Sequence, residues 1–439
     1  MRITNSNKDF CAINQFKFAI VLLLLFVLSS CSSSTTPATP RNQPVPKETA
    51  TQTPTSPTKT PTPTSTFTPT LSLKEIAQAD FLKNSIDLTP ATFESVILDG
   101  SIVFSDSQTD NYFFYDMKNK KIVDIGKSHE ETITDLEVSP NKKLMLVSIC
   151  PKGICDHILR TVDKILKTNL ATEDDWALAR WLDNERFVFL PQIKPGQPLQ
   201  PQHEVIYNVF TGEKSNLQLY LPNPETIGKS GGPDNMFQAS LAPSLKRVIF
   251  TDRNNRLVLW NLDTQKEMAA LPRALGVSEF GSNGWSPDGK KFVTISPYDF
   301  IDPFGRGIMA ANELFIFDMD GNLTQLTHYN EKVPFVSIHK PSWSPDNRRI
   351  AFWLTIGDDA TDPQHLQERL AIFDTSTFEA RLYRSASRAP STSLVWSPDG
   401  QQLIIHVWKT DLTLVDLAHE TESSIPDTQN MWALDWMAP

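Results

Sequence analysis

Short apolar segments alternate with turn-forming residues from about residue 95 to the end of the chain. Three of them, KKFVTIS, RRIAFWLT and QQLIIHVW, are rich in β-branched and aromatic residues and follow Pro, Asp, Asn or Gly. Runs of about four to eight such residues between turn signals are typical of strands, and little of this region shows a helical period. The pattern predicts an all-β fold.

A motif recurs immediately before these strands. It reads WSPDG or WSPDN in three copies and is weaker in three others, and the copies begin at Val138, Trp181, Leu241, Trp285, Trp343 and Trp396. The steps between them are 43, 60, 44, 58 and 53 residues. Each unit adds a third strand such as RLVLWNLD or RLAIFDTS and then a fourth. Four antiparallel strands in about 40–60 residues are the unit of a β-propeller blade, so the repeat predicts a propeller.

The motif has a structural role in such a blade. We expect the tryptophan to end the innermost strand and to pack between neighbouring sheets, and the next four residues to reverse the chain. Proline presets φ, Asp accepts hydrogen bonds from nearby amides, and Gly or Asn tolerates a positive φ. Asp288, Asp346 and Asp399 are therefore interpreted as turn residues and not as catalytic residues.

The two ends of the repeat region complement each other. Residues 431–439 read MWALDWMAP and contain a partial motif at Trp436, while Leu98-Asp99-Gly100 precedes the strand SIVFSD. The last strand is therefore predicted to close the first blade, which removes open sheet edges. The predicted blades are 96–125 with 431–439, 132–168, 176–219, 237–271, 279–327, 336–384 and 392–425. This gives a seven-bladed propeller; another division of 140–236 gives six or eight blades.

The repeat resembles the TolB-like β-propeller family, a WD-repeat-like class with WSPDG turns. The resemblance covers about residues 95–439 and is specific at Trp285, Trp343 and Trp396. TolB also carries an N-terminal α/β domain, whereas here only 71–94 precede the propeller, and LSLKEIAQADFLKN suggests one short helix packed on it. The role of TolB in envelope assembly is therefore not carried over.

The first thirty residues resemble a bacterial lipoprotein signal. Basic residues precede an apolar run from Phe18 to Leu28, which is too short to span a bilayer but suits a secretory signal. The string LSSC, which ends at Cys31, resembles a lipobox and implies that residues 1–30 are removed and Cys31 is lipidated. An uncleaved anchor is the alternative. We expect the protein to be exported and anchored to the outer face of a bacterial membrane, cytoplasmic or outer.

Residues 31–70 form a different kind of polymer. Positions 32–70 hold fourteen Thr and nine Pro. Proline fixes φ and disfavours helix in the residue before it, so we expect a disordered, extended stalk that reaches roughly 100 Å. Whether the stalk is O-glycosylated is left open.

Charge and cysteine usage limit the function classes. The chain has 41 Lys and Arg against 51 Asp and Glu, a formal net charge of −10, which argues against nucleic-acid binding. Cys150 and Cys155 flank Pro-Lys-Gly-Ile and are candidates for a disulfide in an exported protein, with free thiols as the alternative.

Catalytic motifs are absent from the sequence. No Gly-x-Ser-x-Gly nucleophile elbow occurs, and the eight histidines form no HxH or HExxH pattern. His339 lies four residues before Trp343, where an innermost strand enters the channel. The repeat places Thr134, Ala177, Phe237, Gly281, Thr392 and Trp432 at equivalent positions. With Lys340, this ring suggests a binding mouth more than a catalytic centre.

Three predicted connections between second and third strands are long, at about 191–203, 296–312 and 355–369. Insertions on a rigid scaffold often carry binding groups. Acidic residues occur in two of them and could hold Ca²⁺, although solvated loop carboxylates are the simpler interpretation; these are Asp299, Asp302, Asp358, Asp359 and Asp362. No other cofactor is indicated.

Together these features predict a surface-anchored lipoprotein whose propeller binds a protein or glycan partner through the long-loop face, without catalysis and as a monomer. One alternative is an extracytoplasmic hydrolase or lyase with its site in the channel mouth. Another is a structural scaffold of the cell envelope.

Overall fold

The computed structural model describes the part of the chain that forms the repeat region and a short segment before it. The described residues are 82, 84–93, 98–106, 111–125, 133–149, 156–168, 170, 176–191, 202–219, 239–252, 254, 256–272, 284–297, 312–333, 335–357, 366–384, 394–406, 410–429 and 431–439. All of them belong to the compact unit Ser65–Pro439. Almost all regular structure in them is β-strand, with one short 3₁₀ helix, η7 (Tyr329–Glu331).

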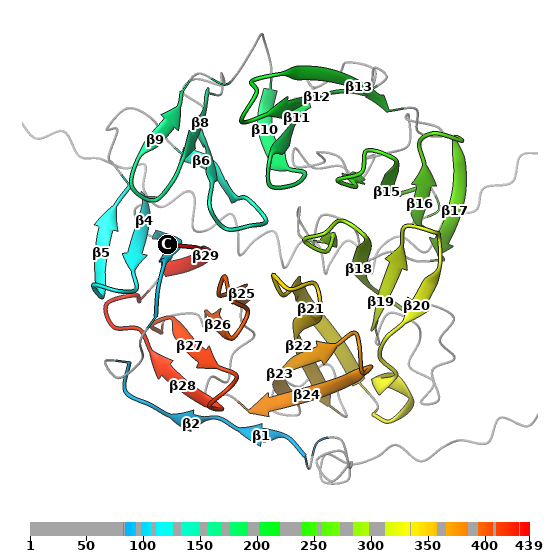
Figure 1. The fold of residues 1–439 in the computed structure, drawn as a ribbon. Coiled ribbons are helices and arrows are strands. Elements are labelled where there is room, and N and C mark those ends of the chain that lie inside the picture. The colour runs from blue at the N-terminus through cyan, green and yellow to red at the C-terminus, as the bar shows by residue number, and fades with distance from the viewer. Residues whose placement is uncertain are drawn as a thin grey trace, which may run out of the picture. The chain divides into compact units, whose positions relative to one another are not determined.

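The strands form seven antiparallel sheets arranged in a ring (Figure 1), which confirms the seven-bladed propeller. Blade 1 contains β29 (Met431–Met437), β3 (Ser101–Asp106), β4 (Asn111–Asp116) and β5 (Lys121–Asp124). Blade 2 contains β6 (Ile133–Val138), β7 (Met145–Ile149), β8 (Asp156–Arg160) and β9 (Ile165–Lys167). Blade 3 contains β10 (Trp176–Trp181), β11 (Arg186–Pro191), β12 (Gln202–Asn208) and β13 (Lys214–Leu219).

The other four blades repeat the order. Blade 4 contains β14 (Ala239–Leu241), β15 (Arg247–Thr251), β16 (Leu257–Asn261) and β17 (Lys266–Leu271). Blade 5 contains β18 (Lys291–Ser296), β19 (Glu313–Asp318) and β20 (Leu323–Gln325), with an isolated bridge from Trp285 to Phe292 on the inner side. Blade 6 contains β21 (Phe335–Trp343), β22 (Arg349–Gly357), β23 (Leu366–Asp374) and β24 (Glu379–Arg384). Blade 7 contains β25 (Leu394–Trp396), β26 (Gln402–Ile405), β27 (Thr413–Asp416) and β28 (Thr421–Ser424).

The ring closes as predicted, because the last strand pairs with the first blade. β29 runs antiparallel to β3, with Met437 opposite Ser101 and Met431 opposite Asp106. The closing strand therefore hydrogen-bonds an edge that would otherwise be open, and residues more than 300 positions apart form one sheet.

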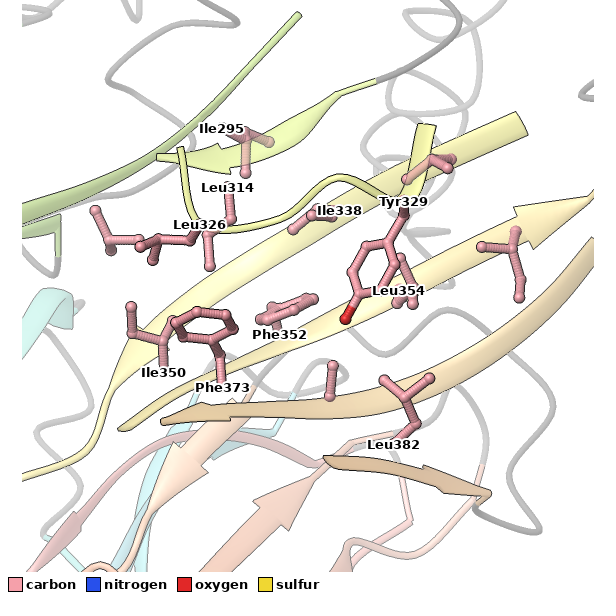
Figure 2. Close-up of a cluster of buried hydrophobic side chains, with 14 of the residues drawn as sticks. Ile295, Leu314, Leu326, Tyr329, Ile338, Ile350, Phe352, Leu354, Phe373 and Leu382 are labelled. Atoms are coloured by element: carbon pink, nitrogen blue, oxygen red, sulfur yellow. The ribbon is translucent and has the colours of Figure 1, made fainter. Parts of the chain in front are cut away.

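The core consists of apolar layers between neighbouring blades. Figure 2 shows the layer between blades 5 and 6, where Ile295 and Leu314 face Ile338, Phe352 and other buried side chains of blade 6. β22 lies between two such layers, and all of its residues except Arg349 are buried. Burial of each large apolar side chain contributes about 1.5–3 kcal/mol to the free energy of folding. A strand with apolar side chains on both faces gains this stabilisation from the two neighbouring blades at once.

The motif turns have the predicted geometry. Trp343 and Trp396 end the innermost strands β21 and β25 and are buried. In the turn after Trp396, the carboxylate of Asp399 accepts hydrogen bonds from Ser397 Oγ at 2.6 Å and from the Gln401 amide at 3.0 Å. Gly400 follows with φ +70°. The aspartates of the motif thus build the turn, which confirms their structural interpretation.

A second turn repeats between the third and fourth strands, where the sequence has a third strand that ends in Asp or another turn residue. The first residue of this turn is Asp or Asn. Its Oδ1 accepts hydrogen bonds from the backbone N–H groups two and three positions later. The residues in this position are Asp116, Asn208, Asn261, Asp374 and Asp416. The fifth residue has a positive φ in each case, and these residues are Lys120, Gly212, Gln265, Phe378 and Glu420. Only one of the five is glycine, so four blades accept left-handed strain at this position.

Residues 82–93 run along the outer rim of the ring (Figure 1). β1 (Ile86–Asp87) adds in parallel to β24, and β2 (Thr89–Pro90) adds in parallel to β28. Leu82, Leu88 and Phe93 are buried in three successive apolar layers, next to blades 6, 7 and 1. We call residues 82–93 the rim strap. Most of the helix expected over 71–84 lies outside the described residues.

Candidate functional site

The innermost strands line a central channel, and β21 presents two polar side chains to it. His339 and Lys340 are both exposed in a strand whose neighbouring residues Ile338 and Pro341 are buried. The register between β21 and β22 shifts between His339 and Ser342, so a β-bulge lies at this point. β21 is the inner edge strand of blade 6 (Figure 1), so the bulge exposes His339 and Lys340 on the side of the blade nearest the ring axis.

Lys340 has an unusual backbone conformation for its residue type. Its φ is +50°, in the left-handed region that glycine adopts without a steric cost. Bulges of this kind commonly place glycine at the left-handed position. The chain therefore holds a charged side chain in the channel at the expense of about 1 kcal/mol of backbone strain.

The imidazole of His339 is affected by the same environment. Although His339 is exposed at its outer atoms, partial desolvation of the imidazole and the neighbouring charge of Lys340 lower the pKa of His339 below its ordinary value of 6.5. The imidazole is therefore neutral at pH 7 and can donate one hydrogen bond and accept another.

Two pairs of opposite charges lie near the inner strands of the described residues. Arg180 in blade 3 lies 2.8 Å from the carboxylate of Glu137 in blade 2. Lys142 in blade 2 lies 2.7 Å from the carboxylate of Asp435 in blade 1. Each pair links two adjacent blades, and within each pair the positive and the negative charge neutralise each other. The sequence analysis did not identify these pairs, since their partners are 43 and 293 positions apart.

The turn end of the channel forms a second feature that the sequence analysis missed. Motif turns of five blades surround a hollow of about 400 Å³. Its lining includes Pro140, Pro287, Pro345, Pro398, Asn141, Asn184 and Asn347. Asn347 Oδ1 accepts a hydrogen bond from the Asp288 backbone N–H at 2.7 Å. Asn141 Oδ1 accepts one from the Ser139 hydroxyl at 2.8 Å. The signal that could have indicated this hollow is the motif itself, because its turns converge on the axis of a propeller.

A buried acid lies at the start of β19, next to the connection that precedes this strand. Glu313 is 1% exposed and accepts hydrogen bonds from Thr327 Oγ1 and, at 2.6 Å, from the Asn330 amide. Burial raises the pKa of Glu313 to about 7, although these hydrogen bonds act to lower it. The carboxyl group thus holds the segment that links blades 5 and 6 to the sheet of blade 5.

Of the other predicted binding residues, the structure describes Trp432. It occupies in β29 the position that His339 occupies in β21, four residues before the motif tryptophan. Trp432 is half-buried, and its ring lies 5.0 Å from the ring of the buried His406. Leu434, at the bulge of β29, is 40% exposed.

The remaining predicted site residues lie outside the described part of the chain. They are Cys31, Cys150, Cys155, Phe237, Thr392, Asp299, Asp302, Asp358, Asp359 and Asp362. Within the described ranges, no group of three or more His, Cys, Asp or Glu side chains is placed to hold a metal ion. The described residues also contain no helix long and apolar enough to cross a membrane.

No family model matches the chain, and no curated protein matches it. Among solved structures, it is similar to Hsv2 of Kluyveromyces lactis, at 12% identity over 65% of this chain and 74% of that chain, with a TM-score of 0.39. It is also similar to an oligogalacturonate lyase of Vibrio parahaemolyticus, at 12% identity over 74% of this chain and 86% of that chain, with a TM-score of 0.47. At this identity the likeness concerns the fold alone.

Proposed function

We propose that the chain is an exported, lipid-anchored lipoprotein whose TolB-like propeller binds a protein or glycan partner at the channel without catalysing a reaction. The observation that carries the binding function is the pair His339 and Lys340, which the innermost strand of blade 6 presents to the channel at a strained bulge. Strained residues that present polar groups are found preferentially at binding and catalytic sites.

The position of the rim strap supports the anchoring part of the proposal. The strap enters the propeller at the outer edge, where Leu82 is buried beside blades 5 and 6. The proposed stalk would therefore join the propeller through the residues that lead to Leu82, at the outer edge of the blades.

The anchor is tested by labelling cells with a radioactive fatty acid. Wild-type protein should incorporate the label and fractionate with membranes, because lipid chains contribute about 0.8 kcal/mol per buried CH₂. Cys31→Ser should abolish the label. Cys11→Ser, in the segment expected to be removed, should retain it. Equal labelling of the Cys31 and Cys11 variants contradicts the proposed lipidation site.

One observation favours a second candidate, the hydrolase or lyase with its site in the channel mouth. A neutral imidazole at His339 can act as a base that takes a proton from a substrate. The neighbouring Lys340 can bind a carboxylate of the same substrate. Product formation that is lost in His339→Gln would establish this candidate in place of the non-catalytic one.

A further inference from the structure

We propose that the outer edges of blades 1, 2 and 3 form a surface that binds the headgroup region of an anionic lipid bilayer. This contact goes beyond the proposed partner binding at the channel, and it does not depend on a lipid at Cys31. Three observations carry it. Exposed apolar side chains gather on these blades, the blades are neighbours, and their outer segments are basic in an acidic protein.

Exposed large apolar side chains are concentrated on one side of the ring. Among the described residues there are seven, and five of them lie on the outer parts of blades 1–3; they are Ile122 and Val123 in β5, Ile165 and Leu166 in β9, and Phe210 in the turn before β13. The outer strands β17 and β20 of blades 4 and 5 contain none. In blades 6 and 7 the rim strap covers the edges of the outer strands. An exposed apolar patch of this kind marks an interaction surface.

The outer edges of blades 1, 2 and 3 follow one another along the ring (Figure 1) and are joined by polar contacts. Arg160 Nη1 of β8 donates a hydrogen bond at 3.1 Å to the carbonyl oxygen of Ile125, directly after β5. Lys167 Nζ of β9 donates one at 2.5 Å to the carbonyl oxygen of Val209, which precedes Phe210. The exposed side chains therefore belong to one continuous surface, which we call the basic rim.

The charge of the outer segments changes sign around the ring. In each blade, this segment runs from the last residue of the third strand to the end of the fourth strand. In blades 1–3 the segments hold seven basic and four acidic residues, a formal charge of +3; they are 116–124, 160–167 and 208–219. In blades 4–7 they hold three basic and nine acidic residues, a formal charge of −6; they are 261–271, 318–325, 374–384 and 416–424. A positive rim on a protein of net charge −10 complements an anionic surface.

The combination of basic and apolar side chains favours a bilayer surface as the partner. Lys118, Lys121 and Lys164 are exposed beside the apolar residues of β5 and β9. Interfacial binding joins burial of apolar side chains among the lipid headgroups to attraction between basic residues and anionic lipids. The side chains lie on the outside of a ring, where a flat and deformable surface can reach all three blades. Because β5 and β9 pair on one side only, their outer N–H groups need water, so the contact is with headgroups and not with the hydrocarbon core.

The test is photo-crosslinking of the full-length Cys31→Ser protein to lipid vesicles, so that no acyl chain holds the propeller at the bilayer. Benzoylphenylalanine replaces either Phe210, which is 68% exposed, or Phe378, which is 60% exposed in the corresponding turn of blade 6. With mixed vesicles of phosphatidylglycerol and phosphatidylcholine, we expect the probe at position 210 to label lipid about fivefold or more above the probe at position 378. Vesicles of phosphatidylcholine alone should give little labelling from either position.

The role of charge is tested in the same protein. Lys121→Gln with Lys164→Gln should lower labelling from position 210 about tenfold or more, because each lysine near an anionic surface strengthens binding about fivefold. Lys246→Gln with Lys266→Gln, at exposed positions of blade 4, is the matched control and should leave labelling unchanged. Raising the salt concentration to about 0.5 M should reduce labelling without any substitution.

Equal labelling from positions 210 and 378, labelling that does not depend on lipid charge, or an unchanged yield in the variant of Lys121 and Lys164 overturns the inference. In a mixture of vesicles and an acidic amphipathic peptide, stronger labelling of the peptide also overturns it, in favour of a protein partner at the basic rim. Each of these outcomes leaves the proposed binding at the channel standing, since the probe reports on the outer edge alone.

Discussion

Trp396 of blade 7 donates a hydrogen bond from Nε1 to the carbonyl oxygen of Ser342 in blade 6, at 3.1 Å. Ser342 is the residue immediately before the motif tryptophan of its own blade. The same relation recurs elsewhere in the ring, where Trp181 bonds to the carbonyl of Glu137 and Trp343 to that of Gly284, each at 3.1 Å. The motif tryptophan is thus both an apolar wedge and a fixed polar link between blades.

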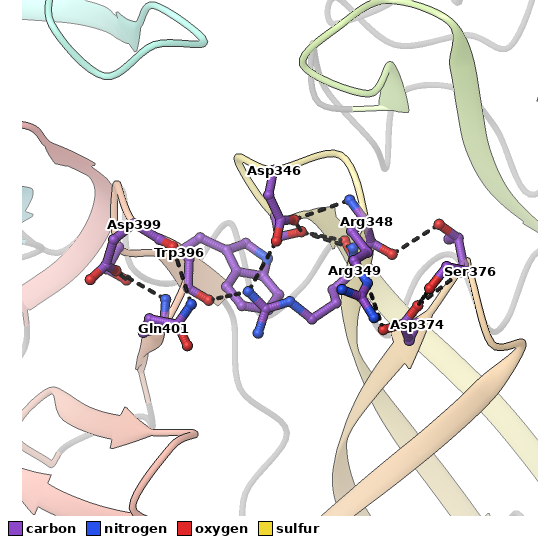
Figure 3. A network of polar contacts seen from close by, with 12 residues as sticks. Asp346, Arg348, Arg349, Asp374, Ser376, Trp396, Asp399 and Gln401 are labelled. Atoms are coloured by element: carbon purple, nitrogen blue, oxygen red, sulfur yellow. Dashed lines mark hydrogen bonds and ion pairs between the residues drawn. The ribbon is translucent and has the colours of Figure 1, made fainter.

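Blade 6 also contacts the ring of Trp396 from a second residue. The Arg349 guanidinium lies 5.3 Å from the ring centroid of Trp396, and its Nη2 donates to the Gly400 carbonyl at 2.7 Å (Figure 3). Nearby, Arg348 pairs with Asp374 at 2.9 Å. Although burial alone would raise the pKa of Asp374, hydrogen bonds from Ser376 and Arg348 hold it well below its usual range. The Arg349 contacts therefore link blades 6 and 7, whereas the Arg348–Asp374 pair lies within blade 6.

The indole link predicts different costs for two similar substitutions. Trp396→Phe keeps an aromatic ring but leaves the Ser342 carbonyl without its donor, so we expect a loss of about 1 kcal/mol or more. Trp285→Phe should cost less or be neutral, because Trp285 Nε1 is buried without a hydrogen-bond partner in the described structure. Urea unfolding of both variants measures the difference. Equal losses would show that the indole link contributes nothing beyond packing.

The closing strand predicts a strict requirement at Gly100. Its φ is +88°, and a Cβ there would lie 2.2 Å from the carbonyl oxygen of Met437 in β29. Gly100→Ala should therefore separate β29 from β3 and lower stability by more than the cost of a positive φ, about 1–2 kcal/mol. Gly212→Ala is the control, since its φ is +75° but its nearest neighbour is 3.7 Å away. The thermal unfolding midpoints of the two variants measure the difference. Similar shifts in both variants would contradict the role of Gly100 in closure of the ring.

The rim strap predicts that residues outside the repeats stabilise the ring. Leu88 is 7% exposed among side chains of blades 6 and 7, so Leu88→Ala should cost about 2–4 kcal/mol. Protease cleavage within 82–93 should become faster in the same variant. Ile122→Ala, on the outer strand of blade 1 and 38% exposed, should have little effect. If both variants unfold at the wild-type urea concentration, the strap is not part of the cooperative unit.

Glu313 predicts a specific dependence of stability on pH. Burial raises the pKa of Glu313 in the folded protein to about 7, from an ordinary value of 4.5. Between these two pH values the unfolded chain has lost the proton while the folded chain keeps it, so stability should fall as pH rises, by about 3 kcal/mol at most. Glu313→Gln, which stays neutral, should remove this part of the decline. Glu379→Gln, at an exposed position, should not. Unfolding free energies at about pH 5 and pH 8 give the comparison, and equal declines in wild type and Glu313→Gln would refute the assignment.

The sequence by itself determined the all-β class and the closure by the last strand, and it favoured seven blades, with six or eight left open until the structure showed seven sheets. These follow from local chemistry, since a tryptophan, a Ser-Pro-Asp-Gly turn and an apolar strand recur at blade spacing. The three copies of Asp in WSPDG or WSPDN could be assigned to turns because Ser-Pro-Asp-Gly is a turn sequence. In the structure each of these aspartates accepts a hydrogen bond from the amide two positions later. His339 and Lys340 could be proposed as binding residues because they lie just before the motif residue Trp343 in the repeat.

Only the tertiary structure decided the contacts that join distant segments. The pairing of Arg180 with Glu137 and of Lys142 with Asp435, the addition of β1 and β2 to blades 6 and 7, and the burial of Glu313 depend on which blades become neighbours. Pro341 within β21 indicates an edge strand or a bulge, but nothing local assigns the left-handed conformation to Lys340. Local sequence sets which strands form, whereas the charge and strain of a channel arise where seven blades meet.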